Sequence, residues 1–410
     1  MLFESEAEMQ SWMRRELEVV DGLSELLDDA ELPEGESEEE KIVLKSYKVC
    51  LGALNYNVLI SENENISLQK GEVLRPDFLM YSSESEAIVI VELKNISAPT
   101  RQAGTELSAY SAEVRAYLPM LAESDVINVL VSTEWPTLLR HYVFNEIVWH
   151  QKNLICLKPV EVDGDIKLAI VAPSELIAGG VSLSLNEHHL GGFHLCLYDM
   201  GLYGGGPKER LDKHLEQMLT ALKYIGAKGT EQRNNGFAFL WKNHREISLA
   251  PYMITIVNVA PFQTIERLVQ AVGVTEGSIL SRIVDICIEY SPAGHGESIC
   301  AQMDSAIEFL NSFCSAQPEG FLQWPELKDL MLEESELVAF QSWGVFEKLF
   351  FDNLKKEYES GNISVASTDA MLGIKTLEEI IDLRHDFFDL SDFRRALDQD
   401  LDEDGVLDIF

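Results

Sequence analysis

Two apolar segments, 75–81 and 87–95, limit what this chain can fold into, because charged residues stand inside them. Both are rich in apolar and β-branched residues, and a turn rich in serine and glutamate separates them. This pattern predicts a β-hairpin. Glu92 and Lys94 are two residues apart near the end of the second strand, so their side chains point to the same face. We expect Asp77, on the first strand, to face them.

These three residue types predict a metal-dependent hydrolytic site. Two carboxylates that converge on one point repel each other and need a cation between them. Hard oxygen ligands suit Mg²⁺ or Mn²⁺. Such an ion polarises a phosphodiester and lowers the pKa of a bound water molecule. The Lys94 ammonium is then placed to hold the attacking water or the charge that develops on the phosphoryl group.

The same residues carry a resemblance to a known family. The two motifs are Arg75-Pro76-Asp77 and Val91-Glu92-Leu93-Lys94. Their pattern resembles the PD-(D/E)XK nuclease superfamily, which has the restriction-endonuclease-like fold, over roughly the first 170 residues. The resemblance implies that Asp77, Glu92 and the backbone carbonyl of Leu93 bind the metal ion. It also implies that Lys94 orients or activates water, and that the product carries a 5′-phosphate.

The resemblance extends to the helix that we expect after the hairpin. Gln102, Glu106 and Tyr110 are four residues apart and share one helix face. In several branches of the superfamily a glutamine and a tyrosine at this point complete the active site. Here Tyr110 matches, while Glu106 occupies the usual glutamine position and Gln102 lies one turn earlier. The role of Glu106 is therefore left open.

An N-terminal helix is similar to the first helix of several of these branches, in which a glutamate approaches the metal ion. The resemblance assigns this role to Glu8, with Glu6 as the alternative. The structural interpretation is that both belong to an acidic first turn, which the helix dipole favours. A second helix carries Lys41, Lys45 and Lys48 along one face. This row either follows a phosphate backbone or is a solvated surface.

The order of the predicted elements indicates an α/β fold. After two N-terminal helices we expect β, β, β, α, β, α, β and β, which fits a mixed sheet flanked by helices. Three domains are predicted: a nuclease-like domain at 1–172, a small α/β domain for recognition or regulation at 173–262, and a helical domain with an acidic tail at 263–410. The last is predicted from apolar residues at helical spacing.

The composition gives further expectations about location and partners. The chain has 410 residues and a formal net charge of −37, with no apolar stretch long enough to span a membrane and no signal-peptide pattern. Its six cysteines are scattered. These features predict a cytoplasmic protein with reduced thiols. We expect the charge to weaken non-specific DNA binding and to favour a basic protein partner.

The segment 208–245 is the most basic part of the chain, and Phe237, Phe239 and Trp241 alternate within it. Basic residues with aromatics are typical of a nucleic-acid surface. Alternating aromatics on a strand are also typical of a core, and the sequence favours the core. The acidic C-terminus imitates the start of a calcium loop but lacks its last ligand.

We therefore expect a Mg²⁺-dependent endonuclease that hydrolyses nucleic acid, with DNA favoured over RNA. The resemblance also suggests a role in prokaryotic anti-phage defence or restriction, and a homo-oligomer. The alternative is a catalytically silent module with the same fold that acts through a partner protein. Intact Asp77, Glu92 and Lys94 favour the enzyme, because a buried charged cluster without a function is costly.

Overall fold

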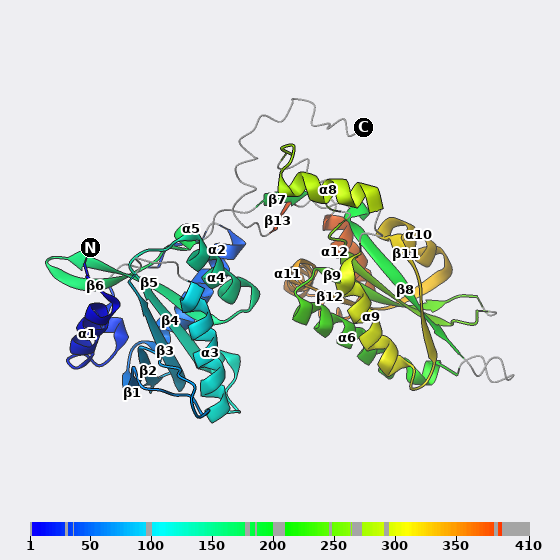
Figure 1. Cartoon of the computed structure of the whole chain (residues 1–410). Helices are drawn as coiled ribbons and strands as arrows, with labels where there is room; N and C mark the ends of the chain where they lie inside the picture. The colour runs from blue at the N-terminus through cyan, green and yellow to red at the C-terminus, as the bar shows by residue number, and fades with distance from the viewer. Residues whose placement is uncertain are drawn as a thin grey trace. The chain divides into compact units, whose positions relative to one another are not determined.

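Two units make up the chain, Met1–Gly180 and Val181–Phe387, and each is built on its own sheet. The structure is a computed structural model (Figure 1). It describes residues 2–28, 32–35, 37–95, 101–176, 181–184, 187–199, 210–245, 248–262, 264, 273–290, 295–380 and 384–387. The acidic C-terminal tail lies outside the described residues.

The first unit confirms the expected order of elements after two N-terminal helices. In chain order the elements are α1 (Glu6–Leu17), η1 (Leu23–Leu26), α2 (Glu38–Ala53), β1 (Asn57–Glu62), β2 (Phe78–Ser82), β3 (Ala87–Lys94), α3 (Arg101–Tyr117), η2 (Glu123–Asp125), β4 (Val126–Ser132), α4 (Thr137–Phe144), η3 (Asn145–Trp149), β5 (Asn153–Val162), β6 (Asp165–Ile170) and α5 (Pro173–Leu176).

The first sheet is mixed, and its strands follow one another in chain order from β1 to β6. The strand β3 pairs antiparallel with β2 and parallel with β4, and β4 pairs parallel with β5. A strand between two neighbours, with helices packed on the sheet, is apolar on both faces. Accordingly, β3 is buried from Ala87 to Leu93. Figure 1 shows α3 running across these strands, and α1 also packs against β3.

The predicted hairpin is present and its register places the charged residues. Phe78 pairs with Val91, and Ser82 pairs with Ala87. Extending this antiparallel register by one residue brings Asp77 opposite Glu92. The turn between the strands includes Glu86 in the left-handed region, at φ 53°. The local sequence therefore determines which carboxylates meet at this end of the sheet.

The second unit corrects the expected domain boundaries. Its elements are β7 (Val181–Ser184), η4 (Glu187–His189), β8 (Leu190–Tyr198), η6 (Asp212–His214), α6 (Leu215–Gln232), β9 (Gly236–Asn243), β10 (Tyr252–Val259), α8 (Ile279–Tyr290), α9 (Gly296–Leu310), β11 (Ser315–Gln323), α10 (Trp324–Glu334), β12 (Ser335–Trp343), α11 (Val345–Glu359), α12 (Ala370–Ile380) and β13 (Arg384–Phe387).

Its sheet has the order β11-β8-β10-β9-β12, and every neighbouring pair is antiparallel. The two outer strands come from the region predicted to be helical, so 173–262 and 263–410 do not form separate domains. The prediction of an all-helical region is wrong because β12 carries Leu337 and Phe340 at a spacing that resembles a helix. The strand β11 contains Pro318 and Gly320, which are unusual in strands.

Helices cover both faces of this second sheet. One face packs on α6 and α9, and the other on α10, α11 and α12. Phe237, Phe239 and Trp241 are fully buried in the second of these layers. Several nearby cations pair with carboxylates: Arg210 with Asp199, Lys228 with Glu231, Lys242 with Asp212, and Arg245 with Glu334. The alternating aromatics are therefore core residues and do not form a nucleic-acid surface.

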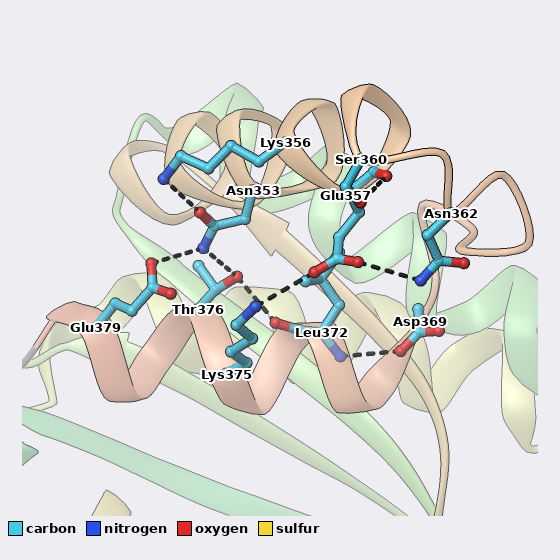
Figure 2. Close-up of polar contacts among 10 residues, drawn as sticks. All are labelled: Asn353, Lys356, Glu357, Ser360, Asn362, Asp369, Leu372, Lys375, Thr376 and Glu379. Carbon is cyan, nitrogen blue, oxygen red and sulfur yellow. Dashed lines mark hydrogen bonds and ion pairs between the residues drawn. The ribbon is translucent and has the colours of Figure 1, made fainter.

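Polar contacts join α11 to α12 on the second face (Figure 2). The side-chain amide of Asn353, which is buried, donates hydrogen bonds to Thr376 at 3.1 Å and to Glu379 at 3.0 Å. Its oxygen accepts from Lys356 at 3.0 Å. All the hydrogen-bonding groups of this amide are thus occupied, so the contacts fix the helices relative to each other.

A close approach in the second unit gives a test of the packing. A Cβ added at Gly229 would lie 2.5 Å from Trp343 Nε1 and 2.6 Å from Gln302 Nε2, which is fully buried. We predict that Gly229→Ala lowers the free energy of unfolding by about 1–3 kcal/mol through overpacking. In the control, Gly52→Ala, the added methyl meets nothing within 4 Å. It should raise stability by up to about 1 kcal/mol. Urea denaturation measures both, and equal stability of Gly229→Ala and the wild type would contradict the packing.

Candidate active site

The candidate site lies where the β2–β3 hairpin meets α1 and α3. Three carboxylates surround the ammonium of Lys94. Its Nζ lies 2.5 Å from Glu92 Oε1, 3.0 Å from Glu106 Oε2 and 3.8 Å from Glu6 Oε1. The Lys94 side chain is only 13% exposed. Residues from three elements of the chain thus converge on one cation.

Asp77 adds a fourth carboxylate, and the hairpin holds it in place. Its Oδ2 accepts a hydrogen bond from the backbone N–H of Leu93 at 2.7 Å. Asp77 is 9% exposed. Its backbone carbonyl and that of Pro76 both accept from the N–H of Asn63 at 3.1 Å. The side chain therefore has little freedom to move away from Glu92.

One oxygen of the cluster has no partner in the described part of the chain. Glu92 is 3% exposed, and its Oε2 is buried without a hydrogen-bond partner. Leaving a buried carboxylate oxygen unpaired costs about 1–3 kcal/mol or more. Four carboxylates around one ammonium also leave the cluster with excess negative charge. Both features favour binding of a cation beside Glu92 and Asp77.

The pKa values of the cluster report the same imbalance. Burial raises the pKa of Glu92 to about 9, and the charge of Asp77 adds to this shift against the effect of Lys94. Burial also raises the pKa of Asp77 to about 6, although the Leu93 N–H lowers it. Burial alone would lower the pKa of Lys94, but Glu92, Glu106 and Glu6 raise it above its ordinary value. Lys94 is therefore firmly protonated.

The structure brings together Asp77, Glu92, Lys94 and Glu106, all of which were predicted as site residues. It does not bring Glu8 to Lys94. The Glu8 carboxylate accepts from the N–H of Glu4 at 2.6 Å, so it closes the start of α1. Glu6, the alternative, is the α1 glutamate that reaches the cluster. The reason is the helix phase, which is set by the cap at Ser5, whose Oγ accepts from the Glu8 N–H.

The remaining predicted residues have different positions. Leu93 is fully buried, and its N–H donates a hydrogen bond to the Asp77 carboxylate. Tyr110 is buried beside the cluster, and its hydroxyl donates to the backbone carbonyl of Arg75 at 3.0 Å. Burial and the nearby carboxylates raise the pKa of Tyr110, so it stays protonated. The Gln102 side chain lies outside the described residues.

Sequence reasoning missed the loop 63–77, which leads into Asp77. Its contacts to α3 come from Tyr110, Glu113 and Tyr117. These positions follow one helix face, since they are three and four residues apart. That spacing was a visible signal, but only the folded chain shows that their partners are backbone groups of the loop.

Within the described ranges, no three histidine, cysteine, aspartate or glutamate side chains form a metal-binding group. The hairpin register places the carboxylates of Asp77 and Glu92 opposite each other, and a metal ion held by these two would complete its shell with backbone and water oxygens. Mg²⁺ is commonly bound in that way, by one or two carboxylates and several waters.

Comparison with known proteins assigns no family to this chain. No protein-family model matches the sequence, and neither the curated proteins nor the solved structures include a significant match. Of the helices in the described residues, none has both the length and the apolarity needed to cross a membrane.

The raised carboxyl pKa values predict how stability depends on pH. A carboxyl with a higher pKa in the folded chain holds more protons when folded, so the free energy of unfolding falls as pH rises between the two values. For Asp77 this interval runs from 3.8 to about 6. Without added metal, Asp77→Asn should be more stable than the wild type above pH 6, by about 1–3 kcal/mol. Below the interval this gain should vanish.

Urea denaturation in EDTA, from acidic to neutral pH, measures this difference. The control is Glu64→Gln, which neutralises an exposed carboxyl and should change stability by less than about 0.5 kcal/mol. A wild-type chain whose stability rises with pH across this range, relative to Asp77→Asn, would show that the buried carboxyl is not destabilising.

Proposed function

We propose that this chain is a metal-dependent nuclease that hydrolyses phosphodiester bonds of nucleic acid, with DNA favoured. The observation that carries the proposal is the unpartnered Oε2 of Glu92, buried opposite Asp77 in a cluster with excess negative charge. This is the environment in which a divalent cation is needed. Two things support the proposal: the observed cluster, and the resemblance of the clustered residues to the PD-(D/E)XK nuclease pattern.

The residues present fit a hard divalent cation. Asp77 and Glu92 would hold it, and the resemblance adds the backbone carbonyl of Leu93. Bound Mg²⁺ or Mn²⁺ would polarise the phosphodiester and lower the pKa of a bound water molecule. Binding would also bring the pKa values of both carboxyls back down, because a neighbouring cation favours the ionised form.

Lys94 acts as a hydrogen-bond donor in this proposal. Its raised pKa keeps the ammonium protonated, so it does not take the proton from water. It can donate hydrogen bonds to the attacking water or to the phosphoryl oxygen on which negative charge develops. One such donor, placed in a buried site, accelerates this type of reaction by about 100–1,000-fold.

Glu106 and Glu6 hold the ammonium in position. Lys94 has a long flexible side chain, and its contacts to α3 and α1 restrict it. This assigns a role to Glu106, which the family pattern left open. Tyr110 acts on the cluster through the backbone that precedes Asp77.

The restriction-endonuclease-like fold is part of this proposal. It is supported by the mixed sheet, the order of helices and strands, and the meeting of the predicted motif residues at one place. A role in prokaryotic anti-phage defence or restriction, and a homo-oligomeric assembly, follow from the resemblance alone.

Cleavage of plasmid DNA tests the proposal. The purified chain should cut DNA in Mg²⁺ or Mn²⁺ and should stop when EDTA is added. Lys94→Ala should cut at least about 100 times more slowly, because the donor is lost. The control Lys355→Ala removes an exposed lysine of α11, in the second unit, and should cut like the wild type. Circular dichroism and the unfolding midpoint check that each variant folds.

The outcomes separate the enzyme from the alternative. Full activity of Lys94→Ala would reject the mechanism. A folded wild-type chain that never cuts DNA or RNA, yet binds a basic protein partner, would instead support a catalytically silent module.

A further inference from the structure

The loop that leads into Asp77 is compact and braced by its own residues. Its two ends meet, because the N–H of Asn63 donates to the carbonyls of Pro76 and Asp77. Within the loop, Ile66 N–H donates to the Leu74 carbonyl at 2.8 Å, and Asn65 Oδ1 accepts from the Leu74 N–H at 2.8 Å. Such closed loops with internal contacts are frequently functional.

The helix α3 fastens this loop at three points. Tyr117 donates to the carbonyl of Ile66 at 2.8 Å, and Glu113 accepts from the N–H of Leu68. Tyr110 donates to the carbonyl of Arg75 at 3.0 Å. The backbone at Arg75 is therefore held between the helix and Pro76, whose ring fixes its own φ. The side chain of Arg75 leaves the loop from a fixed point.

Arg75 stands next to the carboxylate cluster but takes no part in it. It precedes Asp77 by two residues, and the tyrosine that holds its carbonyl is buried near Glu92 and Glu106. The Arg75 side chain is exposed, and in the described part of the chain it makes no ion pair. Lys94, by contrast, pairs with three carboxylates. In a chain with net charge −37, an exposed guanidinium whose backbone is held beside the site can bind an anion.

We propose that Arg75 binds a phosphate of the nucleic-acid backbone beside the bond that is cleaved. This inference rests on the proposed function, and it names the contact that holds the substrate. The guanidinium fork matches two phosphate oxygens at once, and its charge offsets the repulsion between the acidic cluster and the substrate. Because the contact is to phosphate, it carries no preference for base sequence.

The salt dependence of binding tests this contact directly. Fluorescence anisotropy of a fluorescein-labelled DNA duplex is measured with the full chain in EDTA, in which the proposed cleavage does not occur, over a series of KCl concentrations. Each phosphate contact contributes roughly 0.9 to the slope of log affinity against log salt. Arg75→Ala should weaken binding and lower this slope by about 0.9 relative to the wild type. Lys355→Ala, the control with the same loss of charge on α11 of the second unit, should leave the slope unchanged.

Two further variants keep the test decisive. Arg75→Lys retains the charge but loses the fork, so it should keep the slope and bind more weakly than the wild type. Tyr110→Phe frees the carbonyl of Arg75, and it should weaken binding while the slope is retained. A wild-type slope in the Arg75→Ala variant would overturn the inference. A slope that falls in Lys355→Ala but not in Arg75→Ala would overturn it too.

Failure of this inference is distinct from failure of the proposed function. If the wild type cleaves DNA and Arg75→Ala keeps the full slope, the hydrolase stands and the contact is rejected. If the wild type never cleaves DNA, but the slope of log affinity against log salt is lower for Arg75→Ala than for the wild type, the Arg75 contact stands and the hydrolase is rejected. A wild type that binds neither duplex nor single-stranded DNA rejects the contact.

Discussion

One ammonium group among four carboxylates is the interaction on which the candidate site depends. Lys94 offsets part of the repulsion between Glu92, Glu106 and Glu6. Asp77 remains beside them and accepts a hydrogen bond from the backbone N–H of Leu93. Burial makes this imbalance costly, since the interior solvates charge poorly. The rest of the first unit can be understood as the scaffold that holds these groups together in spite of their repulsion.

The scaffold works because each charged group is attached to a rigid element. The buried strand β3 carries Glu92 and Lys94, and the hairpin register brings Asp77 opposite them. The helices α1 and α3 each contribute one glutamate. Few of these positions can relax without unfolding part of the sheet or detaching a helix. Such local repulsion is typical of functional sites, and a bound metal ion would relieve it.

The central part of the site could be predicted from sequence because it depends on local rules. The alternation of a strand places Glu92 and Lys94 on one face, and a short turn sets the register for Asp77. The sequence favoured Glu8 over Glu6, and the correct choice of Glu6 needed the helix phase, which depends on the Ser5 cap. The contacts of the loop 63–77 to α3 could not be predicted, because they join backbone groups that are distant in sequence. In the second unit, β11 and β12 were missed because their residues lack a strand pattern and only pairing with β8 and β9 makes them strands.

The most direct test of the account is the number of protons released when a metal ion binds. At pH 7, the carboxyl of Glu92, with its pKa raised to about 9, is protonated without metal and must ionise to bind one. Calorimetric titration with MnCl₂ in buffers of different ionisation enthalpy measures this release. The account predicts about one proton released per Mn²⁺ bound by the wild type, and loss of Mn²⁺ binding in Asp77→Asn and Glu92→Gln. Equal Mn²⁺ binding by all three chains, or binding without proton release, would contradict it.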